Sequence, residues 1–266
     1  MPKFKADELQ KQYRSKPVAL AEMTDARVSL GRFGSGAPTK ALLAFQMDHA
    51  RAREAVWSTV DEGRLQTEVE GLALDVVAVE SMAQDRSSYL RRPDLGRKLS
   101  AASGERLAAM PALSKGCDVV ITVADGLSSN AVDINAAALI RELTALLRER
   151  GLTLGPLTVA RQARVALSDE VGEILGAKIT IALIGERPGL SAADSLGAYI
   201  TFAPKVGTPD SRRNCVSNIR EGGLSIEQAT TTIAGLVFSM ISTGTSGVGL
   251  KEAMVKLAAI PDKVGS

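Results

Sequence analysis

The second half of the chain contains apolar runs that are separated by amphipathic segments. Residues 119–124 (VVITVA) and 179–184 (ITIALI) are almost continuously apolar and contain no charged residue. An unbroken apolar run of this length is typical of a strand that is covered on both faces, as in the parallel sheets of α/β proteins. We therefore predict two buried strands, each followed by a turn rich in glycine and polar residues.

A helix is predicted between these strands, at residues 131–151. Its apolar side chains recur at helical spacing, and the segment ends in arginines and a glycine, which suits a helix C-terminus. The apolar face consists of Ala136, Ile140, Leu143 and Leu147. Since the helix lies between two predicted strands, it is the connection that a parallel pair of strands requires.

The same alternation continues to residue 244. Further strands are predicted within 152–162 and 196–204. Further helices are expected to begin after Ser168 and Ser225, because serine is a favoured N-cap. Strands that alternate with helices are the βαβ pattern of a parallel sheet.

Residues 1–112 have a different pattern, which is mostly helical. Helices are expected from Pro38 and from Pro93 onward, because proline is favoured in the first turn. Residues 72–81 (LALDVVAVES) are the one segment there that we interpret as a strand. The sequence thus predicts an α/β protein with a smaller, mostly helical N-terminal domain over 1–112. A Rossmann-like, doubly wound parallel-sheet domain follows over 113–266.

Three loops are predicted to form a ligand crevice. They directly follow the buried strands, at residues 125–130, 161–165 and 185–191. In open α/β sheets, ligands bind beyond the carboxyl ends of the strands, so these loops are expected to meet at one edge. No Gly-x-Gly-x-x-Gly stands between a strand and a helix, and no phosphate-loop lysine is present. A standard dinucleotide site is therefore disfavoured.

Single residues near these loops allow two interpretations each. Glu186 and Arg187 form either a solvated ion pair or ligand contacts, and the flanking glycines favour the second. Cys215 is expected to be a buried, small apolar residue. His49, the one histidine of the chain, is predicted to be a core or interface residue. Unless His49 itself serves, His-rich metal sites and nucleophiles activated by histidine are excluded.

Composition narrows the class of protein. The chain has 32 Lys and Arg against 30 Asp and Glu, so its charge gives no reason to expect nucleic acid or an anionic membrane as partner. The two cysteines make a disulfide framework improbable and favour the reducing cytoplasm. No apolar stretch is long enough for a membrane span, and the N-terminus lacks a signal core.

Four segments resemble one protein family, the small subunit (light chain) of ethanolamine ammonia-lyase. They are YLRRPDLGRKLS (89–100), ADGLSSNAV (124–132), VGEILGAKITIALIGERPGLSAADSLGAYITFAP (171–204) and NCVSNIREGG (214–223). The resemblance covers about residues 24–245. GERPGL and CVSNIREGG are together its most specific parts.

The resemblance implies a function in an adenosylcobalamin-dependent lyase. The family enzyme converts ethanolamine to acetaldehyde and ammonia: the cobalt–carbon bond breaks homolytically, the adenosyl radical takes a hydrogen, and the amino group migrates before ammonia leaves. A large subunit carries the substrate site, and the small subunit covers the cobalamin from the side of its nucleotide tail. This chain would then bind the cofactor beside a large-subunit partner and contribute no catalytic residue and no metal ligand.

The resemblance also implies three cofactor contacts. They are Val165 in QARVAL, Glu186 in GERPGL and Cys215 in CVSN. Glu186 is expected to accept hydrogen bonds from amide or ribose hydroxyl groups of the corrinoid, while Val165 and Cys215 supply apolar contact. Asp48-His49-Ala50-Arg51 does not fit the Asp-x-His-x-x-Gly motif with which some proteins replace the lower axial base. The cofactor's own dimethylbenzimidazole is therefore expected to stay on cobalt.

Two alternatives remain open at this point. The chain could be a stand-alone Rossmann-like protein that binds a nucleotide or another cofactor, or a non-enzymatic assembly protein. The location is also open between the cytoplasm and a bacterial microcompartment, to which some relatives are directed by a longer N-terminal extension.

Overall fold

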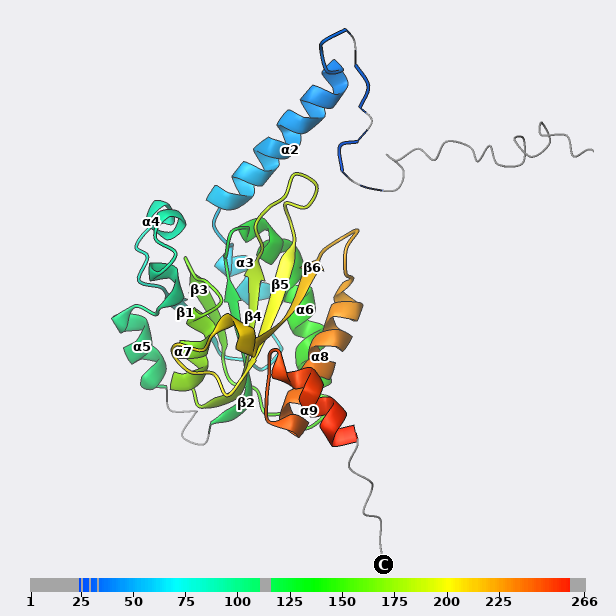
Figure 1. The fold of residues 1–266 in the computed structure, drawn as a ribbon. Helices are drawn as coiled ribbons and strands as arrows, with labels where there is room; N and C mark the ends of the chain where they lie inside the picture. The colour runs from blue at the N-terminus through cyan, green and yellow to red at the C-terminus, as the bar shows by residue number, and fades with distance from the viewer. Residues whose placement is uncertain (1–23, 25, 29, 33, 111–115, 259–266) are drawn as a thin grey trace, which may run out of the picture. The chain divides into compact units, whose positions relative to one another are not determined.

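The structure is a computed structural model, and it describes residues 24, 26–28, 30–32, 34–110 and 116–258 (Figure 1). The chain divides into two compact units, residues 1–50 and residues 51–266. The unit from residue 51 onward contains the whole sheet and is the one that carries the candidate site.

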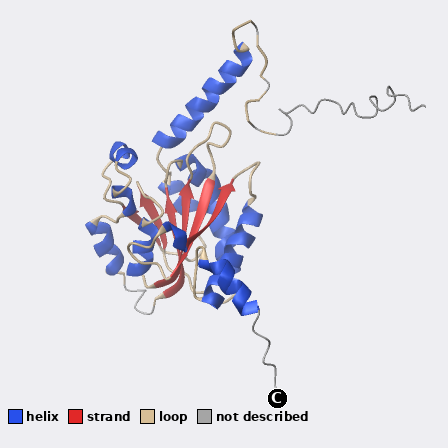
Figure 2. Ribbon diagram, viewed as in Figure 1, coloured by secondary structure: helices blue, strands red, loops and turns tan. Residues whose placement is uncertain are grey.

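Helices and strands alternate through most of the described chain (Figure 2). The helices are α2 (Thr39–Trp57), α3 (Glu62–Glu68), α4 (Arg86–Arg91), α5 (Ala101–Ala108), α6 (Ser129–Glu149), α7 (Leu167–Ile174), α8 (Ile226–Thr243) and α9 (Gly249–Ala258), with 3-10 turns η2 (Leu95–Arg97) and η4 (Asp210–Arg212). The strands are β1 (Val76–Glu80), β2 (Cys117–Ala124), β3 (Leu157–Arg161), β4 (Ala177–Gly185), β5 (Leu196–Phe202) and β6 (Arg213–Ile219). The predicted α/β class is confirmed.

The six strands form one mixed sheet in the order β1-β3-β2-β4-β5-β6. The first four are parallel to one another, whereas β5 and β6 run antiparallel to their neighbours. The prediction of a wholly parallel sheet is therefore wrong from β5 onward. Residues 186–195 join β4 to β5 directly, and a parallel pair would need a longer crossover connection, usually a helix.

Two apolar layers cover the sheet, because side chains of a strand alternate between its faces. Val119, Ile121 and Val123 of β2 pack into the cluster that contains the buried faces of α6 and α8. Val120 and Ala124 pack into the other cluster, with residues of α5 and α7. The apolar face predicted for α6 is buried throughout. Helices thus lie on both faces of the sheet, as expected for a continuously apolar strand (Figure 1).

The sheet also includes residues that precede the predicted domain boundary at 112. The segment predicted as a strand within 72–81 is β1, and it pairs in parallel with β3. The sheet therefore takes one edge strand from the first half of the chain. The division into domains at 112 and the Rossmann-like description stay predictions.

Three helix starts test the local predictions. Ser225 caps α8 in a capping box with Gln228, as predicted. Ser168 does not cap α7: it lies inside the first turn and its hydroxyl donates to the carbonyl of Val165. The segment after Pro93 forms only the 3-10 turn η2, so the predicted helix is wrong there.

In the unit of residues 1–50, the predicted helix after Pro38 is present as α2. His49 is exposed and stacks on Phe45, with 6.2 Å between the ring centroids. Of the two positions predicted for it, the exposure excludes the core. Arg27 pairs with Asp48, and its guanidinium lies over the Phe45 ring. Within the described part of the chain, no helix is both long and apolar enough to cross a bilayer.

Candidate functional site

A cleft of about 610 Å³ lies at the carboxyl edge of the sheet. We call it the edge cleft. It is lined by Arg97, Gly126, Leu127, Arg164, Val165, Ile184, Gly185, Glu186, Arg187, Tyr199, Asp210, Arg213 and Cys215. All three predicted loops contribute to this lining. The prediction that they meet at one edge is therefore confirmed.

The strand order explains why a crevice forms there. β2 connects through α6 to β3 on one side, while the neighbouring strand β4 connects directly to β5 on the other side. The two connections leave in opposite directions, which opens a crevice beyond the carboxyl ends of β2 and β4. Gly126, with a φ of 56°, and Gly185 face each other at its base. A Cβ on Gly126 would lie 2.2 Å from the carbonyl oxygen of Gly185, so only glycine fits.

Asp125 holds the loop after β3 in place. Its carboxylate accepts hydrogen bonds from the backbone N–H groups of Gln162, at 2.9 Å, and Ala163, at 3.0 Å. Asp125 is buried, and burial raises the pKa of this carboxyl, while the bonds from Ala163, Gln162 and Arg86 oppose the shift. Asp125 is therefore an anchor behind the cleft, and it does not line the cleft itself.

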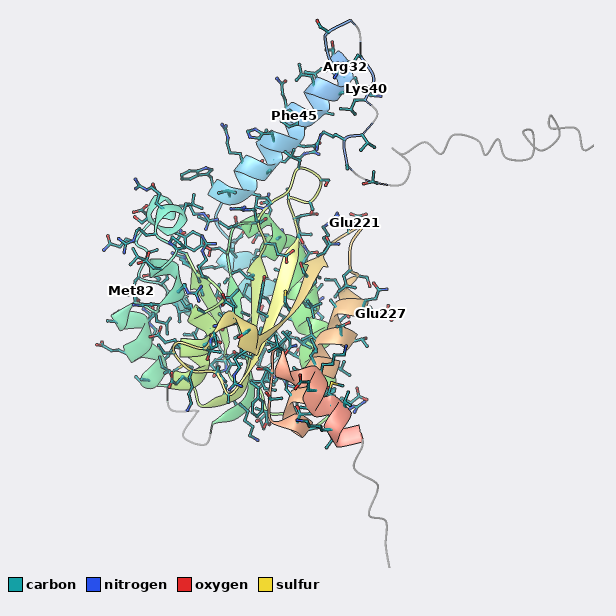
Figure 3. All side chains as sticks on the ribbon, in the orientation of Figure 1. Arg32, Lys40, Phe45, Met82, Glu221 and Glu227 are labelled. Atoms are coloured by element: carbon teal, nitrogen blue, oxygen red, sulfur yellow. The ribbon has the colours of Figure 1, made fainter. Side chains whose placement is uncertain are left out.

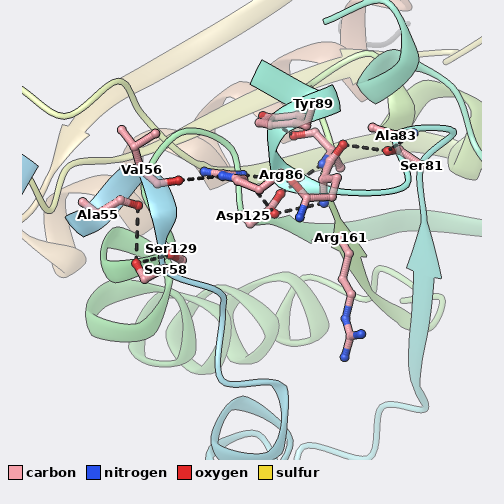
Figure 4. A network of polar contacts seen from close by, with 12 residues as sticks. Ala55, Val56, Ser58, Ser81, Ala83, Arg86, Tyr89, Asp125, Ser129 and Arg161 are labelled. Atoms are coloured by element: carbon pink, nitrogen blue, oxygen red, sulfur yellow. Dashed lines mark hydrogen bonds and ion pairs between the residues drawn. The ribbon is translucent and has the colours of Figure 1, made fainter. Parts of the chain in front are cut away.

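Arg86 is the charged partner of Asp125. It lies at the start of α4, its Nη1 is 3.2 Å from the Asp125 carboxylate, and both side chains are less than 10% exposed. Its Nε donates to the carbonyl of Val56 at 2.6 Å (Figure 4). Because a buried charge is tolerated when it is paired and hydrogen-bonded, the two residues fix each other's position.

Tyr89 and η2 brace the same loop from the outside. The hydroxyl of Tyr89 donates to the carbonyl of Ala163 at 3.0 Å, and the N–H of Arg164 donates to the carbonyl of Gly96 at 2.8 Å. A Cβ on Gly96 would lie 2.8 Å from atoms of the Tyr89 ring. The guanidinium groups of Arg86 and Arg164 both lie over that ring, 4.8 Å and 4.4 Å from its centroid. These contacts hold the loop that presents Val165 to the cleft.

Glu186 lies on the opposite wall with its carboxylate already oriented. It accepts hydrogen bonds from the hydroxyls of Ser195 and Ser217 and a longer one, at 3.3 Å, from the N–H of Asn218. Glu186 does not pair with Arg187, so the ion-pair interpretation of these two neighbours is wrong for the described structure. A carboxylate has about four acceptor positions, which leaves capacity for a ligand donor.

Cys215 contributes a thiol to the cleft wall. It pairs with Tyr199 in the register of β5 and β6, and it is a free, exposed cysteine. The prediction of a buried Cys215 is wrong, because β6 is the edge strand of the sheet and this side chain faces the cleft. Although exposed to solvent, the thiol is partly desolvated by the cleft walls, which raises its pKa. Cys215 is therefore a neutral contact and a poor nucleophile.

The three residues singled out from the sequence come together in this cleft. Val165 follows β3, Glu186 follows β4, and Cys215 belongs to β6, yet all three line the same space. The lining contains no histidine, and the described residues hold no group of three or more side chains that could bind a metal ion. The geometry suits the binding of a ligand by shape, acceptor groups and charge.

A comparison with protein families shows which family the chain belongs to. Residues 15–251 match the family model described as ethanolamine ammonia-lyase light chain (EutC). The chain belongs to the ethanolamine ammonia-lyase light chain family. The resemblance noted for the sequence is thereby confirmed over most of the chain.

Curated relatives of this light chain family agree with the match. The chain is 49% identical to the ethanolamine ammonia-lyase small subunit of Bradyrhizobium diazoefficiens, over 93% of this chain and 94% of that protein. It is 48% identical to the small subunit of Rhodopseudomonas palustris, over 90% and 91% of the two chains. The corresponding protein of Xanthomonas campestris is 46% identical, over 88% and 86%.

The light-chain segment at 89–100 now has a structural role that its sequence did not reveal. It supplies Tyr89 and Gly96, which contact the loop more than sixty residues later in the chain. Only the family resemblance pointed to this segment in the sequence, because no local pattern relates Tyr89 to Ala163. Tyr199 was also missed as a cleft residue, because it lies in a strand whose other residues are largely buried.

A second cavity, of about 490 Å³, lies at the carboxyl ends of β1 and β3. Its polar lining includes Glu80, Arg161 and Asp125, but none of the three predicted site residues. Arg161 is paired there with Glu62 of α3. The edge cleft is therefore the better candidate for the functional site.

Proposed function

We propose that this chain is the small subunit of an adenosylcobalamin-dependent ethanolamine ammonia-lyase and that its edge cleft holds part of the cofactor. One observation carries the proposal: Val165, Glu186 and Cys215 come from three separate segments of the chain and line one cleft at the carboxyl edge of the sheet. The names of the curated relatives support the assignment to this lyase.

The chemistry of the cleft walls fits a corrinoid. Val165, Leu127 and Cys215 offer apolar contact, and the oriented carboxylate of Glu186 is an acceptor for the amide and hydroxyl donors of such a ligand. Gly126 and Gly185 have no side chains, which lets the loops after β2 and β4 pack directly against each other at the base of the cleft.

The size of the cleft fits a site that is shared with another chain. Cavities of about 300–1,000 Å³ enclose drug-sized ligands, and adenosylcobalamin is larger than those. The edge cleft would therefore cover one side of the cofactor. We propose that the large subunit, which the name small subunit implies, covers the other side and carries the ethanolamine site.

The residues of this chain would bind and orient the cofactor without reacting. When bound, adenosylcobalamin supplies the homolysis of its cobalt–carbon bond, which starts the conversion of ethanolamine to acetaldehyde and ammonia. Val165 and Cys215 would exclude water from the face that they cover, and Glu186 would fix the orientation through hydrogen bonds. The lower axial base staying on cobalt, and a location in the cytoplasm or a microcompartment, remain predictions.

The first test is whether Glu186 contributes to cofactor affinity. In the complex with the large subunit, Glu186→Ala should weaken adenosylcobalamin binding by about tenfold or more, because a hydrogen bond with a charged partner contributes roughly 1.5–3 kcal/mol. Equilibrium dialysis measures this directly. Glu221→Ala is the matched control, since Glu221 is exposed and lies outside the cleft lining (Figure 3).

Activity provides the second readout. The purified chain alone should not release ammonia from ethanolamine, and activity should appear when the large subunit and adenosylcobalamin are added. An unchanged affinity in Glu186→Ala would favour an assembly role for this chain. A reconstituted complex that turned over no ethanolamine would remove the substrate assignment.

A further inference from the structure

The edge cleft contains four arginines, and two of them have no carboxylate partner. Arg213 is paired with Asp210 and with a buried aspartate of α7, and Arg97 is 3.6 Å from Asp210. By contrast, neither Arg164 nor Arg187 has an ion pair within the described residues. The cleft thus presents two positive charges that the chain itself does not neutralise.

Arg164 is held in one orientation by its surroundings. Its backbone N–H donates to the carbonyl of Gly96 at 2.8 Å, and its guanidinium stacks over Tyr89 at 4.4 Å from the ring centroid. Its Nε is buried and has no hydrogen-bond partner in the described structure. Arg164 itself lines the edge cleft, so the remainder of its guanidinium is available to a ligand there.

Arg187 contributes a second guanidinium from the neighbouring loop. It is exposed, it lines the same cleft as Arg164, and it follows Glu186 directly in the sequence. The carboxylate of Glu186 accepts hydrogen bonds and repels anions, so a bound anion would lie on the arginine side of the cleft. Guanidinium groups match phosphate oxygens with two parallel hydrogen bonds, which lysine cannot do.

We infer that Arg164 and Arg187 form an anion subsite of the edge cleft that receives a phosphodiester group. The inference rests on the proposed function, because the nucleotide tail of adenosylcobalamin carries one phosphodiester. It adds the orientation of the cofactor in the edge cleft to that proposal. The tail phosphate lies against the loops after β3 and β4, and the amide or hydroxyl donors lie toward Glu186.

The test uses the complete complex of this chain with its large subunit. Dissociation constants are measured by competition for adenosylcobalamin and for adenosylcobinamide, which lacks the phosphate and the nucleotide. Arg187→Gln should weaken adenosylcobalamin by about tenfold or more, as expected for a lost charge-assisted bond, and leave adenosylcobinamide unchanged. Arg164→Lys, which keeps the charge but loses the paired N–H donors of the guanidinium, should show a smaller effect of the same kind. Arg91→Gln, on the exposed surface of α4, is the control.

Each outcome decides the inference. An equal loss for both corrinoids would mean that the arginines act on the fold or on the corrin, and unchanged affinity for adenosylcobalamin would mean that they bind nothing there. Binding of inorganic phosphate to the complex is measured as well. If Arg187→Gln abolished phosphate binding but left the affinity for adenosylcobalamin unchanged, the subsite would belong to a free anion. If the wild-type complex bound no adenosylcobalamin at all, the proposed function itself would fail.

Discussion

Two aspartates at opposite ends of strand β2 have opposite chemistry. Asp118 is the second residue of the strand, and Asp125 is the first residue after it. Burial opposes ionisation of Asp118, but bonds from Lys178 and Thr153 outweigh it and lower its pKa to about 2. At Asp125 burial prevails and raises the pKa, despite the partner Arg86. One residue type thus has two functions, and the end of the strand decides which.

The difference reflects what each edge of the sheet must do. At the amino edge, Asp118 joins two neighbouring segments: it accepts bonds from the N–H of Thr153 at 2.8 Å and from the ammonium of Lys178 at 2.8 Å. Lys178 is 67% exposed, so the pair stays in water. At the carboxyl edge, Asp125 fixes a loop that faces a ligand, and such a loop requires buried, directional bonds.

The largest effect is expected from Asp125→Asn. The change leaves the Arg86 guanidinium buried without its negative partner and presents an amide group to two backbone N–H donors. Breaking a buried ion pair from one side typically costs roughly 3–5 kcal/mol, so urea unfolding of the chain should show a loss of that order. Adding Arg86→Met should restore part of the stability. A loss below about 1 kcal/mol would contradict the role of Asp125 as an anchor.

Cofactor affinity should separate the two edges in the same experiment. In complexes that remain folded, Asp125→Asn should weaken adenosylcobalamin binding, because an asparagine has a single acceptor oxygen and the loop that carries Val165 loses one of its two bonds to residue 125. A change at the amino edge should leave affinity alone. If substitutions at the two edges weakened cofactor affinity equally, the difference between the two aspartates would concern only the overall stability of the fold.

A smaller effect is expected from Tyr89→Phe. The ring and its stacking on Arg86 and Arg164 remain, but the hydroxyl no longer donates to the buried carbonyl of Ala163. Leaving one buried acceptor unpaired costs about 1–3 kcal/mol, and the cofactor should bind more weakly as the loop loosens. Thermal unfolding and equilibrium dialysis measure the two quantities. Normal affinity together with lowered stability would limit Tyr89 to a role in folding.

Local pattern predicted those parts of the fold that are built from continuous signals. The apolar runs gave β2 and β4, and the amphipathic period gave α6 with its buried face. Strand β6 was missed because it lies at the edge of the sheet and buries only Arg213, Val216 and Ile219, a spacing that follows neither a strand nor a smooth helix. A bulge and the positive φ of Asn218 explain this irregular pattern.

The sequence predicted where the candidate site lies, but only some of the residues that form and support it. The rule for parallel sheets located the crevice, and the family resemblance supplied Val165, Glu186 and Cys215. Neither could reveal that Asp125 points away from the cleft or that Tyr89 supports it. Those roles depend on contacts between residues 37 or more positions apart, at Ala163 and Gln162, and local pattern carries no information about such pairs.

The smallest and sharpest effect concerns pH. A carboxyl whose pKa is lower in the folded chain than in the unfolded chain stabilises the fold at any pH above its unfolded-state pKa. This stabilisation is lost as the pH falls through the folded-state pKa. For Asp118 the window runs from the ordinary 3.8 down to about 2. Asp118→Asn should therefore lower stability by about 1 kcal/mol at neutral pH, a modest value because Lys178 is exposed. The difference between variant and wild type should shrink toward zero as acid unfolding is followed below pH 4. A difference that stayed constant across this window would show that shape, and not charge, makes Asp118 useful at the amino edge.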